Sequence, residues 1–391
     1  MKILLLTRFL SVGVAGGDYV GAIIAELLAK NGNHVWVITN KMEGVKTIEH
    51  ENIHPIFVSL KKSFPEGMKL GKTEPLRYNL SAIRIGLSII KKEKIDIIHS
   101  NQSFGTFAVF AGAVLSKLTG TPHIKLIHHF ASVGRDFRAQ VLKDMGNVGW
   151  KAFLRYVLER FSVKLNCTAV HAVSEATRDD LIKLGEKKPI FVIHNAIPIP
   201  NQVEKPQVNQ FQLVHISRLV YYKNVDIVLK ALKIVKKTFP NVSLVIVGDG
   251  PYKKNLEKMV SELSLQQNII FKSHVSEKEK QELIATSQAL VFPSLHEGFG
   301  LVILEAFAQK RPVLVSNVRP MSDIVEHGKT GFVVSPQDEN EWAKAIELII
   351  QYPERTSRMG VNGRCVLEVK YSIETMKNNL IKMYEESIKN K

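Results

Sequence analysis

The feature that most constrains the fold of this chain is the alternation of short β-branched or leucine-rich runs with helical segments. Residues Lys2–Thr7 lead through a glycine-bearing loop to an amphipathic segment at Asp18–Lys30, which the turn Asn31-Gly32-Asn33 ends. Further buried strands are expected at Val35–Thr39, Ile95–His99, Ile124–His128 and Ala169–Val173. Because this alternation is typical of parallel sheets with crossover helices, it predicts a doubly wound α/β domain.

A proline-rich stretch then interrupts the pattern. Between Asn195 and Gln212 the periodicity disappears and three prolines occur, which predicts a linker and hinge. The alternation restarts in a second series of expected strands at Leu213–Ser217, Ser243–Val247, Ile269–Lys272, Ala289–Pro293 and Pro312–Ser316, with helices at Val225–Lys237 and Phe299–Lys310. Since a domain averages roughly 150 residues, the 391 residues are interpreted as two α/β domains, 1–197 and 198–370, followed by a C-terminal helix at 371–391.

The composition excludes several classes of protein. With 45% hydrophobic and 23% charged residues, the chain is neither disordered, fibrous nor a disulfide-stapled miniprotein. Its two cysteines, Cys167 and Cys365, lie far apart and suggest neither a disulfide framework nor a zinc site. The longest apolar run, Phe107–Leu115, is much shorter than the roughly 20 residues of a membrane span. Arg8 interrupts the apolar N-terminus too early for a secretory signal, so we expect a cytoplasmic protein.

The charge indicates the kind of partner. The formal net charge is +16, with 53 Lys and Arg against 37 Asp and Glu, and the surplus is greater in the first 200 residues than in the rest. Such a balance favours nucleotide phosphates, anionic lipid or nucleic acid, without choosing among them.

The most informative segment is Leu290–Ser316. A strand ends at Pro293, a short glycine loop follows, and a helix then leads to another strand. Gly298 and Gly300 allow the backbone to approach a ligand closely, and the free amides at the helix start favour an anion such as a diphosphate.

Two carboxylates bracket this loop. Glu297 precedes the helix and Glu305 lies about two turns into it. Their carboxylates are positioned to accept hydrogen bonds from sugar hydroxyls at two points of one elongated ligand. In the alternative interpretation, Glu305 pairs at the helix surface and Glu297 merely favours the helix dipole.

The segment resembles the Glu-x7-Glu signature of retaining glycosyltransferase family 4, whose members have the GT-B fold with two Rossmann-like domains and an interdomain cleft. The resemblance implies that Glu305 holds the nucleotide ribose and that Glu297 lies beside the donor sugar. It further implies that the backbone of Gly298, Phe299, Gly300, Leu301 and Val302 faces the diphosphate and sugar.

A second match is the segment His215–Asp226, which is similar to the Gly-Arg-Leu-x-x-x-Lys-Gly stretch of the family. Arg218 and Lys223 would neutralise the pyrophosphate leaving group without a metal. Ser217 and Asn224 replace the two glycines of that stretch, which puts the local backbone geometry in question. Outside the family context, an Arg and a Lys at this spacing are commonly a solvated pair.

Matches in the first domain are the loop with Gly13, Gly16 and Gly17, and His128. The loop stands where the family carries a Gly-Gly loop near the donor phosphate or the acceptor, although a tight structural turn explains it equally well. His128 matches the family histidine beside the donor sugar, whereas a lone histidine is more often a satisfied core residue. The neighbouring His129 makes the choice within this pair open.

Weaker matches extend the resemblance over nearly the whole chain. They are His171–Glu175, Val247–Pro251 and Asp323–Gly331, and the family's final helix, placed here at Ser372–Lys389, returns to the first domain. Ala196, Asp323 and Lys310 depart from the family's Gly, Glu and Gly.

Missing motifs narrow the chemistry. The chain contains no Asp-x-Asp motif, so no metal ligand set for a diphosphate is apparent and no cofactor is expected. It contains neither a Walker motif nor a Gly-x-Ser-x-Gly elbow, which disfavours phosphoryl transfer and acyl hydrolysis.

The basic N-terminal half offers a further partner. Basic residues crowd a loop-like stretch at Lys61, Lys62, Lys69, Lys72 and Arg77, and Trp150–Leu165 has an aromatic stripe at helical spacing. One hypothesis is peripheral contact with an anionic membrane at the inner face, which would bring the enzyme to a lipid-linked acceptor. In the alternative, the stripe packs on the sheet and the charges are solvated. Nucleic-acid binding is disfavoured, because no recognition motif is present.

The sequence therefore predicts a retaining glycosyltransferase. It would move a sugar from a nucleoside-diphosphate sugar to the hydroxyl of a glycan or lipid-linked acceptor, in polysaccharide or glycolipid biosynthesis. The leaving diphosphate would take the acceptor proton, so no protein nucleophile is required. A nucleotide-sugar 2-epimerase or hydrolase on the same fold is the alternative.

Overall fold

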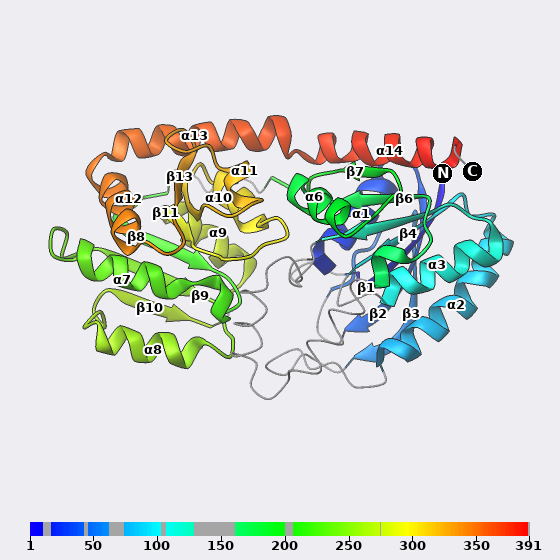
Figure 1. Ribbon diagram of the computed structural model, residues 1–391, viewed down its shortest axis with the longest axis horizontal. Helices are drawn as coiled ribbons and strands as arrows, with labels where there is room; N and C mark the ends of the chain where they lie inside the picture. Colours follow the sequence, from blue (N-terminus) through cyan, green and yellow to red (C-terminus); the bar gives the residue numbers. More distant parts are fainter. Residues whose placement is uncertain are drawn as a thin grey trace. The chain divides into compact units, whose positions relative to one another are not determined.

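A computed structural model gives the structure of residues 1–10, 17–42, 46–61, 74–102, 107–128, 161–199, 206–273 and 275–389. Its contacts divide the chain into two compact units. The first comprises Met1–Asn195 together with Ile373–Lys391, and the second comprises Ala196–Ser372. Each unit is an α/β domain built on its own parallel sheet (Figure 1), so the predicted fold class is confirmed at the level of both domains.

The first unit contains a sheet in the order β3-β2-β1-β4-β5-β6-β7, and every pairing is parallel. Its strands are β1 (Lys2–Phe9), β2 (His34–Met42), β3 (Ile53–Lys61), β4 (Ile97–Asn101), β5 (His123–Ile127), β6 (Ala169–Ala172) and β7 (Ile190–Val192). Its helices include α1 (Gly17–Lys30), α2 (Glu74–Glu93), α3 (Phe107–Thr119), α6 (Glu175–Lys183) and α14 (Ile373–Lys389).

The helices of this unit cover both faces of the sheet. Right-handed crossovers that run in opposite directions across a sheet place their helices on opposite faces, and here α1 leads from β1 to β2, whereas α2 and α3 lead the other way, to β4 and β5. Accordingly α2 and α3 pack side by side over one core, built around Leu4, Leu6 and Leu115, whereas α1 contacts α14 (Figure 1). The C-terminal helix α14 thus belongs to the first unit, where the Tyr384 hydroxyl and His99 Nδ1 form a hydrogen bond of 2.7 Å.

The second unit contains a parallel sheet in the order β10-β9-β8-β11-β12-β13. Its strands are β8 (Asn209–Ile216), β9 (Ser243–Val247), β10 (Ile269–Lys272), β11 (Ser287–Phe292), β12 (Val313–Ser316) and β13 (Gly331–Val334). Its helices are α7 (Val225–Val235), α8 (Lys253–Glu262), α9 (Glu277–Thr286), α10 (Leu301–Ala308), α11 (Met321–Ile324), α12 (Glu339–Gln351) and α13 (Pro353–Lys370), with the 3-10 turn η1 (Tyr221–Lys223). Its core includes the fully buried Trp342.

Several predicted boundaries were wrong, among them that of the strand predicted at Ile95–His99, which is β4 at Ile97–Asn101, and two that lie closer to the candidate site. Strand β8 begins at Asn209, so the last part of the predicted linker Asn195–Gln212 pairs with β11 instead. The helix predicted from Phe299 to Lys310 begins at Leu301, because Gly300 is in the left-handed region at φ 92° and serves as its N-cap.

Among the described residues, no helix is both long enough and apolar enough to cross a membrane.

Candidate functional site

The segment after β8 carries both predicted cations and is held in place by a glycine turn. Ser217 N donates to the Val247 carbonyl at 3.1 Å, and Leu219 N donates to the Asp249 carbonyl at 2.8 Å. Gly248 makes this approach possible: at φ 138° a Cβ there would lie 1.9 Å from the Ser217 carbonyl oxygen. The turn after β9 therefore fixes the backbone on both sides of Arg218.

The buried side chain of His215 supports the same segment. The Nδ1–H of His215 donates to the Val291 carbonyl at 2.9 Å, and its Nε2 lies 2.7 Å from the Ser217 hydroxyl. Burial, reinforced by the charge of Lys223, lowers the pKa of His215 to about 4. The imidazole is therefore neutral at pH 7, and Nε2 accepts the hydrogen bond from Ser217. Sequence reasoning missed His215 as a supporting residue.

The two cations differ in their surroundings. The Lys223 ammonium forms an ion pair with the Glu297 carboxylate, and the two side chains are only 11% and 14% exposed. It also lies 4.9 Å from the ring centroid of Phe292, within the range of a cation–π contact. Arg218 is exposed and makes no ion pair within the described part of the chain. The structure therefore brings Lys223 together with Glu297, whereas among the described residues no ion pair joins Arg218 to Glu297.

The backbone at Asn224 keeps a conformation that glycine commonly adopts, although asparagine replaces the family's glycine there. This residue lies at φ 54° and ψ 32°, in the left-handed region, where the family motif carries glycine. Asn is among the residues that tolerate this conformation best. Its side-chain amide donates to the Pro336 carbonyl at 2.9 Å, which anchors the turn before α7.

The glycine loop leads into α10. Glu297 and Gly298 are half-buried in the loop, and Phe299 is buried with its ring 5.7 Å from that of Tyr371 in an edge-to-face contact. The amides of Leu301 and Val302 stand in the first turn of α10, where helix geometry supplies no acceptor. These amides point along the helix axis and create an anion-attracting N-terminus.

The second glutamate has a different partner. Lys280 of α9 donates to the Glu305 carboxylate of α10 at 3.0 Å and also pairs with Glu277 at 2.9 Å. Burial raises the pKa of Glu305 above its usual value, although Lys280 opposes this. Burial alone would lower the pKa of Lys280, but the charges of Glu305 and Glu277 outweigh it and raise that pKa. Glu297 and Glu305 therefore belong to two separate ion pairs, one at each end of the loop and helix.

In the first unit, His128 follows β5 and is held by Asn101 at the end of β4. His128 Nε2 lies 2.7 Å from Asn101 Oδ1, while Asn101 Nδ2 donates to the Thr7 hydroxyl at 3.2 Å. Since the Asn101 oxygen is the acceptor, Nε2 of His128 carries the proton. Burial lowers the pKa of His128 to about 3, with a smaller effect of His171 in the same direction. His128 is thus a neutral imidazole, and Asn101 is a second residue that the sequence did not single out.

His128 is one of four buried histidines of the first sheet. The pKa values of these histidines are all lowered by burial, to about 3 for His123 and about 4 for His171, and well below the usual range for His99. His123 Nδ1 donates to the Asn166 carbonyl and His171 Nε2 donates to the Ile193 carbonyl. These contacts hold one ring nitrogen of each histidine within the core, which explains why a lone histidine in this sequence carries little information.

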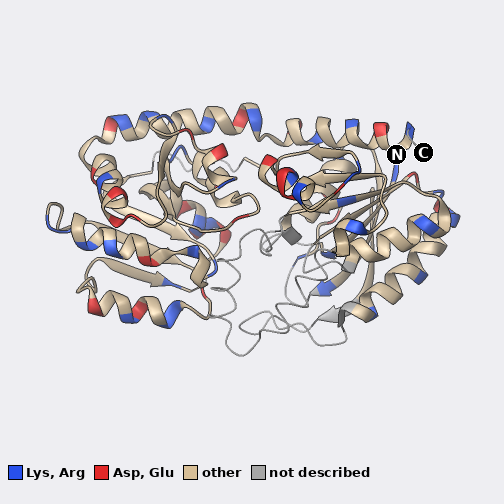
Figure 2. Cartoon of the chain, viewed as in Figure 1, with Lys and Arg blue, Asp and Glu red and all other residues tan. Residues whose placement is uncertain are grey.

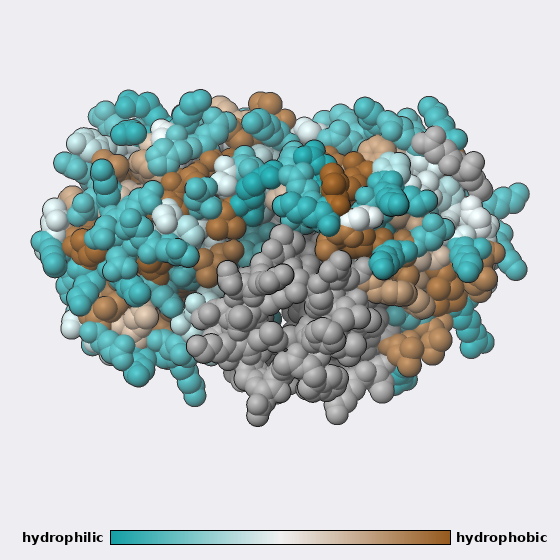
Figure 3. All heavy atoms as spheres, viewed as in Figure 1, coloured by the Kyte–Doolittle hydropathy of each residue, from teal (hydrophilic) through white to brown (hydrophobic). Residues whose placement is uncertain are grey.

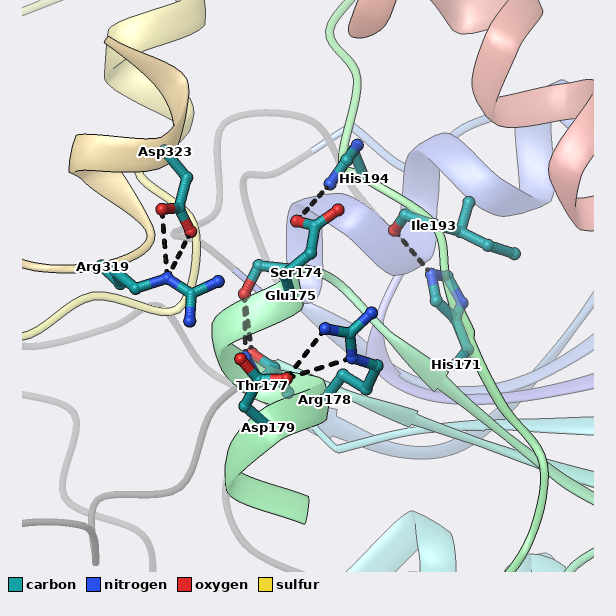
Figure 4. Close-up of polar contacts among 10 residues, drawn as sticks. All are labelled: His171, Ser174, Glu175, Thr177, Arg178, Asp179, Ile193, His194, Arg319 and Asp323. Carbon is teal, nitrogen blue, oxygen red and sulfur yellow. Dashed lines mark hydrogen bonds and ion pairs between the residues drawn. The ribbon is translucent and has the colours of Figure 1, made fainter. Parts of the chain in front are cut away.

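The ends of two further matching segments are drawn in Figure 4. Ser174 caps α6 by accepting from the Thr177 amide at 3.1 Å, and His194 pairs with Glu175 at 2.9 Å (Figure 4). In the second unit, Arg319 donates to both carboxylate oxygens of Asp323, at 3.0 and 2.8 Å (Figure 4). The departure from Glu to Asp at position 323 thus leaves a paired carboxylate.

Other predicted residues lie outside the described part of the chain. Gly13, Gly16 and His129 are among them, whereas Gly17 is the first residue of α1. Within the described residues, no group of three or more His, Cys, Asp or Glu side chains is arranged to hold a metal ion.

Two family models match the chain in succession. The model of glycosyltransferase family 4 matches residues 16–199, and the model of glycosyl transferases group 1 matches residues 199–366. The capsular polysaccharide biosynthesis glycosyltransferase CapM of Staphylococcus aureus is 25% identical over 381 residues, covering 93% of each chain.

Solved structures share the fold over the full length. The sucrose-phosphate synthase of Thermosynechococcus elongatus aligns with a TM-score of 0.81 at 19% identity and covers 100% of both chains. Anabaena HepE in complex with UDP-glucose aligns with a TM-score of 0.74 at 19% identity, covering 99% of this chain and 100% of that one.

Proposed function

The chain belongs to the glycosyltransferases of the GT-B fold, resembling family 4, and from this premise we propose that it transfers a sugar from a nucleoside-diphosphate sugar to an acceptor hydroxyl with retention of the anomeric configuration. The observation that carries the proposal is the buried ion pair of Lys223 with Glu297, at the start of the loop that leads into α10. The largely buried ammonium of Lys223, paired with a carboxylate of the loop that precedes α10, is a cation that an anionic ligand can bind.

We expect the donor to bind by replacing the Glu297 carboxylate as the counter-ion of Lys223. Without donor, the Glu297 carboxylate neutralises Lys223. In our proposal the diphosphate takes over this role, together with Arg218 and the amides of Leu301 and Val302, and Glu297 is released toward the sugar hydroxyls. The exposed guanidinium of Arg218 has no ion pair to break among the described residues, and it can form a bidentate contact with a phosphate.

Glu305 would take the ribose. Its carboxylate accepts from Lys280, and two ribose hydroxyls supply the same kind of donor. HepE, which shares the fold, has been solved in complex with UDP and with UDP-glucose, which supports a nucleotide-sugar donor for this chain.

The chemistry would rest on stabilising the leaving group. As the bond between the sugar and the diphosphate breaks, negative charge develops on the diphosphate, and Lys223, Arg218 and the helix amides oppose it. The acceptor hydroxyl then forms a bond to the same face of the anomeric carbon, and its proton passes to the departing diphosphate. We propose that this step requires no metal and no covalent enzyme intermediate, and that His128 binds the donor sugar as a neutral imidazole.

The acceptor is proposed to be a glycan or lipid-linked saccharide. CapM, similar over 93% of its length, is named for capsular polysaccharide biosynthesis, which favours an acceptor of that class.

The direct test is to incubate the chain with a panel of nucleoside-diphosphate sugars, with and without acceptors, in the presence of a chelator. Nuclear magnetic resonance of the product should show the anomeric configuration of the donor. Nucleoside diphosphate should be released as fast with the chelator as without it. An inverted product would contradict the proposed retention. An epimerised donor formed without acceptor would favour the 2-epimerase alternative, and free sugar alone would favour a hydrolase.

A further inference from the structure

A cavity of about 640 Å³ lies at the edge of the first sheet where its strands begin. Its walls come from the loops that precede β5, β6 and β7 and from the last turn of α14. These three strands are parallel neighbours, so the loops before them meet at one edge. His128 follows β5 at the opposite edge. Ligands of parallel sheets generally bind at the carboxyl ends of the strands, so this cavity of ligand size is separate from the candidate site.

A buried lysine fixes two of the loops that form the cavity. The side chain of Lys125 on β5 is fully buried. Its ammonium donates at 3.3, 3.0 and 3.2 Å to the carbonyls of three residues before β6, which are Ser162, Val163 and Leu165. It also donates at 2.8 Å to the carboxylate of Glu186, which precedes β7. Because breaking a buried ion pair is costly, the cavity walls are preformed.

The end of α14 forms another wall and offers an unsatisfied hydroxyl. The hydrogen bond of Tyr384 with His99 holds this part of α14 on the sheet. Ser387 follows three residues later, lines the cavity and is 2% exposed. Its hydroxyl finds no hydrogen-bond partner among the described residues. Since a buried hydroxyl without a partner is unfavourable, a polar ligand in the cavity would be stabilised by bonding to Ser387.

Two threonines of the wall have protons to donate. The Thr168 hydroxyl accepts from the His123 amide at 3.1 Å, and the Thr121 hydroxyl accepts from Thr119 at 2.9 Å. Within the described residues neither hydroxyl donates to a protein acceptor, so each can donate to a ligand.

The rest of the wall combines apolar groups with charges of both signs. Phe191, Pro122 and Pro189 supply apolar surface, while Lys188 and Glu386 supply one charge of each sign. Figure 2 shows acidic and basic residues interspersed along α14, and the surface of this helix is mainly hydrophilic in Figure 3. The cavity therefore favours a neutral ligand that has both hydroxyl groups and an apolar side.

We propose that this cavity, which we call the amino-edge cavity, binds a short neutral saccharide. Sugar hydroxyls both donate and accept, so they match the hydroxyls of Ser387, Thr121 and Thr168, and a carboxylate such as Glu386 accepts from them. The C–H faces of a sugar ring pack on apolar side chains such as Phe191. A nucleotide is disfavoured, because Lys188 is the one cation that lines the cavity among the described residues and Glu386 opposes it.

A saccharide held there would keep a glycan near the enzyme and raise its local concentration. This consequence rests on the proposed function, whereas the binding itself does not, because every residue of the cavity belongs to the first unit. The amino-edge cavity also takes no part in the membrane contact that the sequence suggested. The segments indicated for that contact fall largely within residues 62–73 and 129–160, outside the described part of the chain.

The test is saturation-transfer nuclear magnetic resonance of the full chain with four disaccharides: maltose, cellobiose, lactose and N,N′-diacetylchitobiose. The wild-type protein should transfer saturation to at least one of them. Ser116→Trp should abolish this transfer, because Ser116 of α3 is half-buried and lines the cavity, which the indole would fill. Lys117→Trp supplies the control, since Lys117 is the exposed neighbour that does not line the cavity. Circular dichroism checks that both variants fold.

A second pair of variants tests the polar contacts without filling the space. Glu386→Ala should weaken saccharide binding at least about ten-fold, whereas Glu385→Ala, at an exposed position of α14 outside the cavity wall, should leave it unchanged. Lys223→Met should also bind the saccharide normally, because this lysine belongs to the second unit. A failure of the proposed donor chemistry would therefore leave the saccharide result intact.

Three results would overturn the proposal. The first is the absence of transfer to all four disaccharides with the wild-type protein. The second is transfer that survives in Ser116→Trp, because the saccharide would then bind elsewhere. The third is uridine displacing the bound disaccharide at a lower concentration than the disaccharide itself requires, in the Lys223→Met background, because the cavity would then prefer a nucleoside.

Discussion

Replacing Lys223 by methionine tests two roles of this side chain, one in the stability of the fold and one in the transfer reaction. Methionine keeps most of its volume and removes its charge, which leaves Glu297 buried without its partner. Breaking a buried ion pair by removing one side costs about 3–5 kcal/mol. Since the two side chains retain 11% and 14% exposure, we expect a loss of about 2–4 kcal/mol, discounted for solvent screening.

The double variant Lys223→Met, Glu297→Gln separates the effect on the transfer rate from the effect on stability. It removes the unpaired charge as well, so most of the lost stability should return. The rate should stay at least about 10²–10³-fold below that of the wild type, because the cation opposite the leaving diphosphate is still missing and the carboxylate proposed to bind the sugar hydroxyls is lost as well.

Stability is to be measured by urea unfolding and the rate by release of nucleoside diphosphate. The exposed pair Lys258–Glu262, at 79% and 59% exposure, supplies the control, and Lys258→Met should change neither quantity appreciably. A Lys223→Met enzyme with full turnover, or a double variant that regains the wild-type rate, would refute the role assigned to this lysine.

Three further outcomes are expected. The four buried histidines of the first sheet have folded-state pKa values below the unfolded value of about 6.5, so the unfolded chain binds more protons in acid. Stability should therefore fall below about pH 6.5 by up to about 1.4 kcal/mol per histidine and pH unit, and urea unfolding at about pH 7.5 and about pH 5.5 measures this loss; equal stability at the two values would contradict it. Gly248→Ala should cost about 2–4 kcal/mol and activity, because its Cβ would meet the Ser217 carbonyl oxygen, whereas Gly185→Ala, with positive φ and open space, should cost less and leave activity intact. Lys310→Gly should raise the melting temperature, since residue 310 ends α10 at φ 55° and a left-handed lysine costs about 1 kcal/mol, while Lys310→Ala should not.

The strands were the most predictable part of the fold, because parallel strands buried on both faces are continuous apolar runs. Strand β1 is such a run, buried from Ile3 onward. Strand β3 escaped prediction because Pro55 interrupts it, and proline is tolerated there since β3 lies at the edge of the sheet. Strand β8 was predicted too short, since its first residues are polar and only partly buried.

The site was predictable as residue types in sequence order but not as contacts. The sequence indicated Glu297, Glu305 and Lys223 and correctly placed a glycine loop before a helix, but no spacing rule reveals that Lys223 pairs with Glu297 and Lys280 with Glu305. Lys223 and Glu297 lie in the connections that follow the neighbouring strands β8 and β11, whereas Lys280 and Glu305 lie on the helices α9 and α10 before and after β11. Only the packing of the folded sheet and its helices brings each pair together.

The two positions at which this chain lacks a glycine of the family show the same limit of prediction from sequence. Asn224 and Lys310 both retain the left-handed backbone that glycine would adopt. Sequence alone could not tell whether the loops kept their shape, because the answer depends on whether tertiary contacts hold a strained residue in place.

The central claim is that the second unit binds an activated sugar through its diphosphate. Calorimetric titration of the full chain with nucleoside diphosphates and with the corresponding monophosphates tests it most directly. The diphosphate should bind at least about ten-fold more tightly than the monophosphate, equivalent to about 1.4 kcal/mol, and Lys223→Met should abolish the difference. Equal affinity for the two nucleotides, or a preference for the diphosphate that survives the loss of Lys223, would contradict the account.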